Sequence, residues 1–231
     1  MNIVYEDREI IAVNKAPGVS SQADKGERGS LMEDVALYLG RPSSDIYIIN
    51  RLDKPVGGLV LFAKDKGSAA SLTKQVAERT IKKRYYAVVN GETPQNGRLE
   101  DYMIKIERLN ISKIADKGNK SAKKAILTYK LTQRIGDGEI LSLLDIDLET
   151  GRHHQIRLQL SNMGHPIWGD RKYNPAEKYS QGASVSPKSK GDIALFAYGL
   201  EFKHPRTGKL ISLKLDMPNT QPFSRMREIK L

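Results

Sequence analysis

The chain has 231 residues and a mass of 25.8 kDa, long enough to bury a core without disulfides or structural metals. It contains no cysteine, which excludes thiolate catalysis, iron–sulfur clusters and cysteine-based zinc sites. Lysine and arginine outnumber acidic residues by 38 to 27, and the resulting charge of +11 favours a polyanionic partner such as nucleic acid. No apolar run approaches the roughly 20 residues that cross a bilayer, and no signal-peptide pattern opens the chain. We therefore expect a soluble, cytoplasmic protein.

The first half of the chain predicts short elements in close succession. Two apolar runs at 3–5 and 10–13 flank a polar tetrad and predict a β-hairpin, so no module is expected ahead of it. Ser30 followed by Glu33 predicts a capping box and a helix to about residue 39. The next expected elements are strands at 46–49 and 58–63 with the polar loop 50–57 between them, a helix at 67–79 and a strand at 85–89.

The second half predicts further strands around one helix. The expected strands are 102–106, 125–131, 140–148, 193–202 and 210–215, with a helix at 154–163. This succession predicts an α+β fold, a mixed, largely antiparallel central sheet with flanking helices and loops, in one domain spanning 1–231. Two segments are predicted as exposed excursions: the lysine-rich 108–124, either solvated surface or an RNA-contacting arm, and the Ser/Pro/Gly-rich 174–191.

Charged residues with possible chemical roles fall in two stretches. Asp53 follows Arg51 by two positions in the polar loop, a pattern that by itself is more typical of a surface turn with a capping aspartate. Segment 150–157 gathers arginines, histidines and a glutamine at a predicted helix start, where backbone N–H groups also favour an anion. Arg157 follows a core-facing residue, so we expect it to be partly buried and to need a carboxylate, Asp53 being one candidate.

The strand at 85–89 carries neighbouring tyrosines. Because side chains alternate along a strand, Tyr85 and Tyr86 face opposite sides and one of them is expected inside. An ordinary half-buried tyrosine is the commoner interpretation, and a ring that stacks on a nucleobase is the functional one. The histidines show no metal-ligand spacing and no nucleotide-binding fingerprint occurs, so neither a metal nor a cofactor is expected.

Four blocks together resemble the RluA-type pseudouridine synthase family over nearly the whole chain. They are Arg51-Leu52-Asp53 continuing through 58–64, Lys83-x-Tyr85-x-Ala87-x-Val89-x-Gly91, Leu148-x-Thr150-Gly151-Arg152-x-His154-Gln155-Ile156-Arg157, and Gly164-x-Pro166-Ile167-x-Gly169-Asp170-x-x-Tyr173. The chain departs from the usual family pattern at Asn50, Val56, Gly57 and His153, which bears on loop contacts and target choice.

The resemblance implies a pseudouridine synthase fold and the conversion of uridine to pseudouridine in structured ribosomal or transfer RNA, with no cofactor. Asp53 is the implied catalytic carboxylate, since an ionised carboxylate suits attack at C1′ or stabilisation of positive charge developing there. Arg157 is its implied partner, and Tyr85 is the implied stacking ring and acceptor of the C5 proton. The target uridine is expected to be flipped out of the RNA by a monomeric enzyme. Further RNA-binding residues are expected at Arg51, Arg152, His154 and Gln155.

Two other functions stay open at this point. A non-catalytic RNA-binding protein on the same scaffold is favoured by the charge of +11 and by the unusual Val56-Gly57 pair. A nucleoside glycosidase is the other, although the motif blocks contain no obvious second carboxylate.

Overall fold

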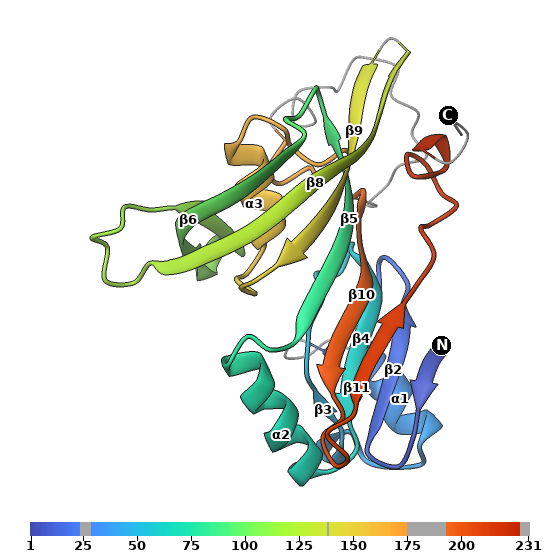
Figure 1. The fold of residues 1–231 in the computed structure, drawn as a ribbon. Helices are drawn as coiled ribbons and strands as arrows, with labels where there is room; N and C mark the ends of the chain where they lie inside the picture. The colour runs from blue at the N-terminus through green and yellow to red at the C-terminus, as the bar shows by residue number, and fades with distance from the viewer. Residues whose placement is uncertain (24–28, 138, 175–192, 227–231) are drawn as a thin grey trace. The chain divides into compact units, whose positions relative to one another are not determined.

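The computed structural model describes residues 1–23, 29–137, 139–174 and 193–226 (Figure 1). The chain divides into two compact units. Unit 1 contains Met1–Lys83 and Ala197–Asp216, and unit 2 contains Arg84–Phe196 and Met217–Leu231. Each unit is described by itself below.

Unit 1 is built on antiparallel strand pairs. Strand β1 (Asn2–Glu6) pairs with β2 (Ile10–Lys15), which pairs with β4 (Gly57–Ala63). The short β3 (Tyr47–Ile48) also pairs with β4, and β10 (Leu195–Lys203) pairs with β11 (Leu210–Lys214). Every residue of β4 is buried, as expected for the apolar run 58–63 at the centre of a sheet.

Local sequence signals set the two longer helices of unit 1. Helix α1 (Leu31–Tyr38) begins at the predicted capping box, in which Ser30 accepts from the Glu33 backbone N–H and Glu33 accepts from that of Ser30. Helix α2 (Lys66–Ala77) is capped by Asp65 and buries Ala69 and Leu72. These side chains join an apolar cluster from the strands: Ile10, Ala12, Leu59, Leu61, Ala63, Ile81, Leu200, Phe202 and Leu213.

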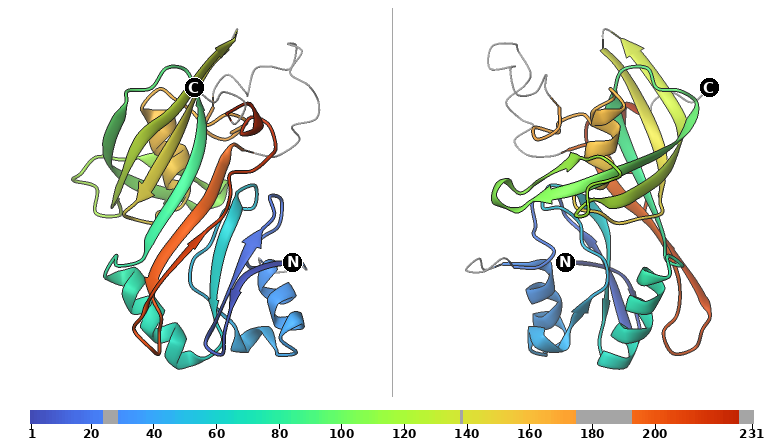
Figure 2. Two further views of the ribbon diagram at one scale, coloured as in Figure 1. Left: turned by 45° about the vertical axis from the view of Figure 1, so that its right-hand side comes forward. Right: turned by 90° about the vertical axis from the view of Figure 1, so that its left-hand side faces the viewer.

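Unit 2 is an antiparallel sheet with one longer helix beside it. Its strand order is β5 (Lys82–Asn90), β9 (Glu139–Leu148), β8 (Lys123–Asp137), β6 (Asn96–Ile106) and β7 (Ile111–Ile114). Helix α3 (Gln155–Asn162) lies against β6 and β7, and Figure 2 shows it beside these strands in both views. Short 3-10 turns occur at Ser43–Asp45, Glu107–Leu109 and Ser224–Met226.

The α+β class is confirmed, whereas the expectation for segment 108–124 needs a correction. Part of it is not loop, because Ile111–Ile114 forms β7 and pairs with the end of β6. Asn110 makes the tight connection in a left-handed backbone conformation, φ +47°, which asparagine tolerates well. Ser112 and Lys113 between the two isoleucines obscured this strand in the sequence. The other predicted excursion, 174–191, lies outside the described residues except for Asn174.

No helix in the part of the chain that the structure describes combines the length and apolar character needed to cross a lipid bilayer.

Candidate active site

The loop that carries Asp53 is tied to its surroundings on both sides of the aspartate. The side-chain amide of Asn50 makes two hydrogen bonds to the backbone of β4. It donates to the Leu59 carbonyl at 3.0 Å and accepts from the Leu61 N–H at 2.8 Å. The Ser21 hydroxyl donates to the Leu52 carbonyl at 2.8 Å and accepts from the Leu52 N–H at 3.1 Å. This bonding gives the loop a fixed backbone path, so the unusual Asn50 has a structural explanation.

Lys15 contacts this loop, and it is not one of the candidate site residues predicted from the sequence. Its side chain is 0% exposed at the end of β2, and its ammonium donates to the carbonyls of Ala16, Val19 and Lys54 at 3.1, 2.7 and 3.1 Å. Burial lowers the pKa of Lys15 to about 8, and the opposite charge of Asp53 counteracts part of that decrease. A cation thus lies within electrostatic range of Asp53 inside unit 1.

Close packing at two glycines after Asp53 gives a structural reason for one further departure from the family pattern, Gly57. A Cβ on Gly57 would lie 3.1 Å from Cδ of Pro17, in the loop that follows β2. Gly58 has φ +120°, and a Cβ there would lie only 2.2 Å from the Ala197 carbonyl oxygen. The close packing of β4 therefore requires a glycine at position 58 and favours a very small residue at position 57.

The alternation predicted one inward-facing tyrosine at 85–86, and in the structure it is Tyr85. It is buried in β5 with Ala87 and Val89, opposite Ile146 of β9, while Tyr86 is only half-buried. The position fits either interpretation of a buried strand tyrosine, and its contact with a base stays a prediction.

Gln155 is held entirely by groups of unit 2. Its side-chain oxygen accepts from the Thr150 hydroxyl at 2.8 Å and the Arg152 N–H at 3.0 Å, and its amide nitrogen donates to the Ile126 carbonyl at 3.1 Å. This bonding gives the side chain a structural role, and the predicted contact between Gln155 and RNA stays a prediction. Arg152 is half-buried and donates from Nε to the Lys124 carbonyl at 2.9 Å, and Arg51 is exposed in the Asp53 loop.

Arg157 is buried as predicted, being 4% exposed, and it pairs with a carboxylate of its own unit. Its Nε and Nη2 donate to the two Asp170 carboxylate oxygens, each at 2.8 Å. The Tyr173 ring lies near the guanidinium, with Cζ 5.3 Å from the ring centroid. The expected pairing of Arg157 with Asp53 stays a prediction.

The two adjacent histidines stack on one another, with ring centroids 3.7 Å apart. His154 is buried, and its Nδ1 lies 2.8 Å from the Tyr173 hydroxyl. The Nδ1 of His153 lies 2.9 Å from the Ser112 hydroxyl, and its Nε2 lies 3.0 Å from the Asn110 side-chain oxygen. The histidine pair is therefore part of a polar network that joins the start of α3 to β7.

Sequence reasoning missed Lys15, Asp170 and Tyr173 as members of the site. The signal for Lys15 was a single cation at the end of a strand that begins with four apolar residues, where burial would demand acceptors. Asp170 and Tyr173 stand in the fourth motif block, yet only the need of a buried Arg157 for a carboxylate pointed toward them.

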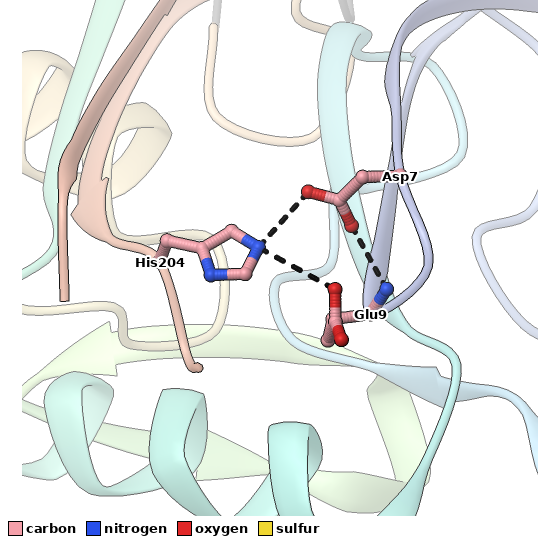
Figure 3. Close-up of side chains that lie close together, drawn as sticks. All are labelled: Asp7, Glu9 and His204. Carbon is pink, nitrogen blue, oxygen red and sulfur yellow. Dashed lines mark hydrogen bonds and ion pairs between the residues drawn. The ribbon is translucent and has the colours of Figure 1, made fainter. Parts of the chain in front are cut away.

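One group in the described residues has the spacing of a metal site, and its hydrogen bonds argue against that function. Figure 3 shows Asp7, Glu9 and His204 of unit 1, with His204 Nε2 at 2.9 Å from Asp7 Oδ2 and 3.9 Å from Glu9 Oε2. The N–H groups of Arg206 and Thr207 both donate to His204 Nδ1, so the ring proton is on Nε2. A metal-bound histidine has the opposite arrangement, with the nitrogen facing the metal deprotonated. The cluster is therefore a hydrogen-bond network that joins the β1–β2 and β10–β11 hairpins.

Comparisons with known proteins agree on one family. The sequence pattern of a family described as RNA pseudouridylate synthase matches residues 9–162. Ribosomal large subunit pseudouridine synthase D of Neisseria meningitidis serogroup B is 34% identical over 226 residues, or 95% of this chain and 59% of its own length. tRNA pseudouridine synthase C of Vibrio parahaemolyticus is 30% identical in an alignment 241 residues long. The alignment covers 97% of this chain and 94% of the relative's own length. The chain spans about three fifths of the length of the first curated relatives it matches.

A solved structure shows the same fold. Human RNA Pseudouridylate Synthase Domain Containing 1 matches with a TM-score of 0.74 at 20% identity, covering 95% of this chain and 84% of the human one.

Proposed function

Because the chain belongs to the RNA pseudouridylate synthase family, we propose that it isomerises uridine to pseudouridine in RNA. The observation that carries the proposal is the hydrogen-bonded loop around Asp53. This loop holds the Asp53 carboxylate near the buried Lys15 cation and leaves Asp53 partly exposed to solvent. An ionised carboxylate in such a setting suits reaction at an electron-poor sugar carbon.

The proposed reaction rearranges the nucleotide without net gain or loss of atoms. The N1–C1′ glycosidic bond breaks, the uracil turns, and a C5–C1′ bond forms. Asp53 either attacks C1′ or stabilises the positive charge that develops there. The proton on C5 then leaves, with Tyr85 as its proposed acceptor, and N1 gains a proton. The reaction involves no redox change, so we propose that it needs no cofactor.

We propose that the substrate is a structured RNA from which the target uridine is flipped. Relatives of this chain carry names that assign them to the ribosomal large subunit or to tRNA, and both RNA classes are candidates here. Flipping has an unstacking cost of about a few kcal/mol, which contacts between basic side chains and phosphates offset. Arg51, Arg152 and His154 are the proposed RNA-contacting residues. We further propose that the protein acts as a monomer, with one catalytic domain, in the cytoplasm.

Release of tritium from RNA that contains [5-³H]uridine tests the proposed function. Wild-type protein is expected to release tritium from ribosomal or transfer RNA transcripts, and Asp53→Asn and Asp53→Ala are expected to abolish release while binding RNA normally. Asp45→Asn is the matched control, because Asp45 is an exposed aspartate of the same unit.

Three outcomes would contradict the proposal in different ways. Binding of RNA by the wild type without tritium release from any RNA would favour a non-catalytic RNA-binding protein. Free uracil among the products would indicate a glycosidase. Undiminished release by the Asp53 variants would remove Asp53 from the mechanism.

A further inference from the structure

The Arg157 guanidinium is fixed along one edge by a buried acid, Asp170. Asp170 is 0% exposed and contacts both Nε and Nη2 at 2.8 Å, in the bidentate geometry that matches a planar guanidinium to a carboxylate. The same carboxylate accepts the Lys172 N–H at 2.9 Å, and the Asp170 carbonyl accepts the Asn174 N–H at 2.9 Å. Asp170 is therefore held by its own turn and imposes its orientation on the arginine.

The guanidinium also lies over the ring of a second fixed residue. The Tyr173 ring lies with its centroid 5.3 Å from the arginine Cζ, and the tyrosine is itself held at both ends. Its hydroxyl accepts the Ser112 N–H at 2.7 Å and lies 2.8 Å from His154 Nδ1, while its carbonyl accepts from the Ser161 hydroxyl. The bidentate bonds along one edge and the neighbouring ring together restrict the position of the guanidinium and the direction of that edge.

The segment that carries Asp170 and Tyr173 is hydrogen-bonded to β5, the strand that contains Tyr85. Trp168 donates its N–H to the Val88 carbonyl at 3.0 Å, and Asn90 donates its N–H to the Pro166 carbonyl at 3.0 Å. Asp170 N–H then donates to the Ile167 carbonyl at 3.1 Å. These hydrogen bonds connect the backbone of β5 to the turn that carries Asp170, within unit 2.

Stability alone is a poor explanation for this arrangement. Burying an arginine and an aspartate removes two charges from water, and a well-packed apolar pair of similar volume is often equally stable or more stable. What a buried bidentate pair provides in addition is a defined orientation of the guanidinium. Catalytic groups need such definition, because a displacement of about 1 Å can lower a rate by about a hundredfold.

We propose that Asp170 and Tyr173 are positioning residues, which act on the isomerisation by holding the Arg157 guanidinium in one orientation. The proposal rests on the proposed function, which supplies the reaction, and on the role as partner of the catalytic carboxylate that the family resemblance implies for Arg157. Neither positioning residue needs to touch the nucleotide, so their loss should lower the chemical rate and leave RNA affinity nearly unchanged.

A double-mutant cycle tests the proposal through single-turnover tritium release with enzyme in excess and RNA saturated. Asp170→Asn and Arg157→Lys are each expected to lower the rate by about 10- to 100-fold, with RNA dissociation constants within about threefold of wild type. The double variant is expected to be no slower than the slower single variant, because both changes remove the same oriented guanidinium. Tyr173→Phe keeps the ring and loses the hydroxyl bonds, so a smaller decrease of about 3- to 10-fold is expected.

Gln159→Met is the matched control. Gln159 is a buried polar residue of α3, the helix that carries Arg157. Its side-chain amide donates a hydrogen bond to the Asp101 carboxylate at 2.8 Å and makes none to Asp170 or Tyr173. This variant is expected to lose thermal stability and to keep the wild-type chemical rate at temperatures where it is folded.

The outcomes separate this proposal from the proposed function. A wild type that releases no tritium refutes the proposed function itself. If the wild type is active, multiplicative rate losses in the double variant, or wild-type rates in both Asp170→Asn and Tyr173→Phe, overturn only the positioning role. Should Asp170→Asn fail to fold, the cycle is carried out with Tyr173→Phe and Arg157→Lys, and the same criterion of non-additivity decides.

Discussion

The Lys15 ammonium donates a hydrogen bond to the Lys54 carbonyl oxygen 3.1 Å away, and so links the end of β2 to the residue directly after Asp53. Two further bonds from the same ammonium, to Ala16 and Val19, hold the neighbouring loop. A single buried cation therefore organises two loops that are far apart in the sequence, and it contributes positive charge near the proposed catalytic carboxylate.

The perturbed pKa of Lys15 predicts a change of stability with pH. Burial lowers this pKa from 10.5 to about 8, so between these values the unfolded chain binds more protons than the folded chain. The free energy of unfolding contributed by Lys15 therefore rises with pH across this window and is lowest below about pH 8. Relative to Lys15→Met, the wild type is expected to gain about 2 kcal/mol between pH 7.5 and 10.

Urea denaturation of both proteins at several pH values measures this difference. Lys66→Met is the control, since Lys66 is exposed. Its free energy of unfolding should change with pH in parallel with that of the wild type. A wild-type advantage over Lys15→Met that stays constant from pH 7.5 to 10 would contradict the prediction.

The position of Tyr85 predicts a separation between binding and chemistry. Tyr85→Phe keeps the buried ring and removes only the hydroxyl, so RNA affinity should stay within about threefold of wild type. Loss of the proposed proton acceptor should slow tritium release by about 10²- to 10⁴-fold. Tyr86→Phe, on the opposite face of β5, should leave the rate unchanged. Equal rates for the two variants would exclude Tyr85 from the proton transfer.

Much of unit 1 was predictable because its signals are local. The Ser30 capping box forms as predicted, since it depends on two residues three positions apart. In unit 2, the alternation in β5 likewise predicted that one of the two tyrosines faces inward, and Tyr85 is the buried one. The resemblance that pointed to Asp53 likewise depends on short motifs in a fixed order, which a single sequence displays directly.

The contacts that were not predictable connect distant segments. The partner of Arg157 was open because burial requires a carboxylate but does not say which one, and Asp170 lies thirteen positions away on another segment. Lys15 needed three carbonyl acceptors from two loops, and no pattern in the sequence brings those loops together. Strand β7 was missed because it gains its order from pairing with β6 rather than from its own composition.

The close approach at Gly58 predicts a large loss of stability on a small substitution. In Gly58→Ala the new Cβ would lie 2.2 Å from the Ala197 carbonyl oxygen, and the backbone at φ +120° is unfavourable for any other residue. We expect a decrease of at least about 3 kcal/mol in the free energy of unfolding. Gly208→Ala is the matched control, because φ is +70° and nothing lies within 4 Å of its Cβ. Its expected decrease is about 1–2 kcal/mol, and similar losses in both variants would contradict the steric argument.

The basic segment 108–124 of unit 2 predicts a surface that contributes to RNA affinity. Lys124 is paired with Glu100 at 2.6 Å, whereas Lys113 and Lys120 are exposed. Each lysine that neutralises a phosphate releases counterions, so its removal makes the salt dependence of binding shallower. For Lys113→Gln combined with Lys120→Gln, we expect weaker binding at low salt. The slope of log K against log salt concentration should decrease in magnitude by about 1–2.

Binding titrations of labelled transfer RNA between low and moderate salt check this expectation. A double variant of Lys66→Gln and Lys74→Gln is the matched control, because it removes the same charge from exposed positions of α2 in unit 1. An equal loss of affinity and slope in both double variants would assign the effect to net charge. A change confined to the first variant would place phosphate contacts on the β6–β7–β8 side of unit 2, where a charged side chain acts only within about a Debye length.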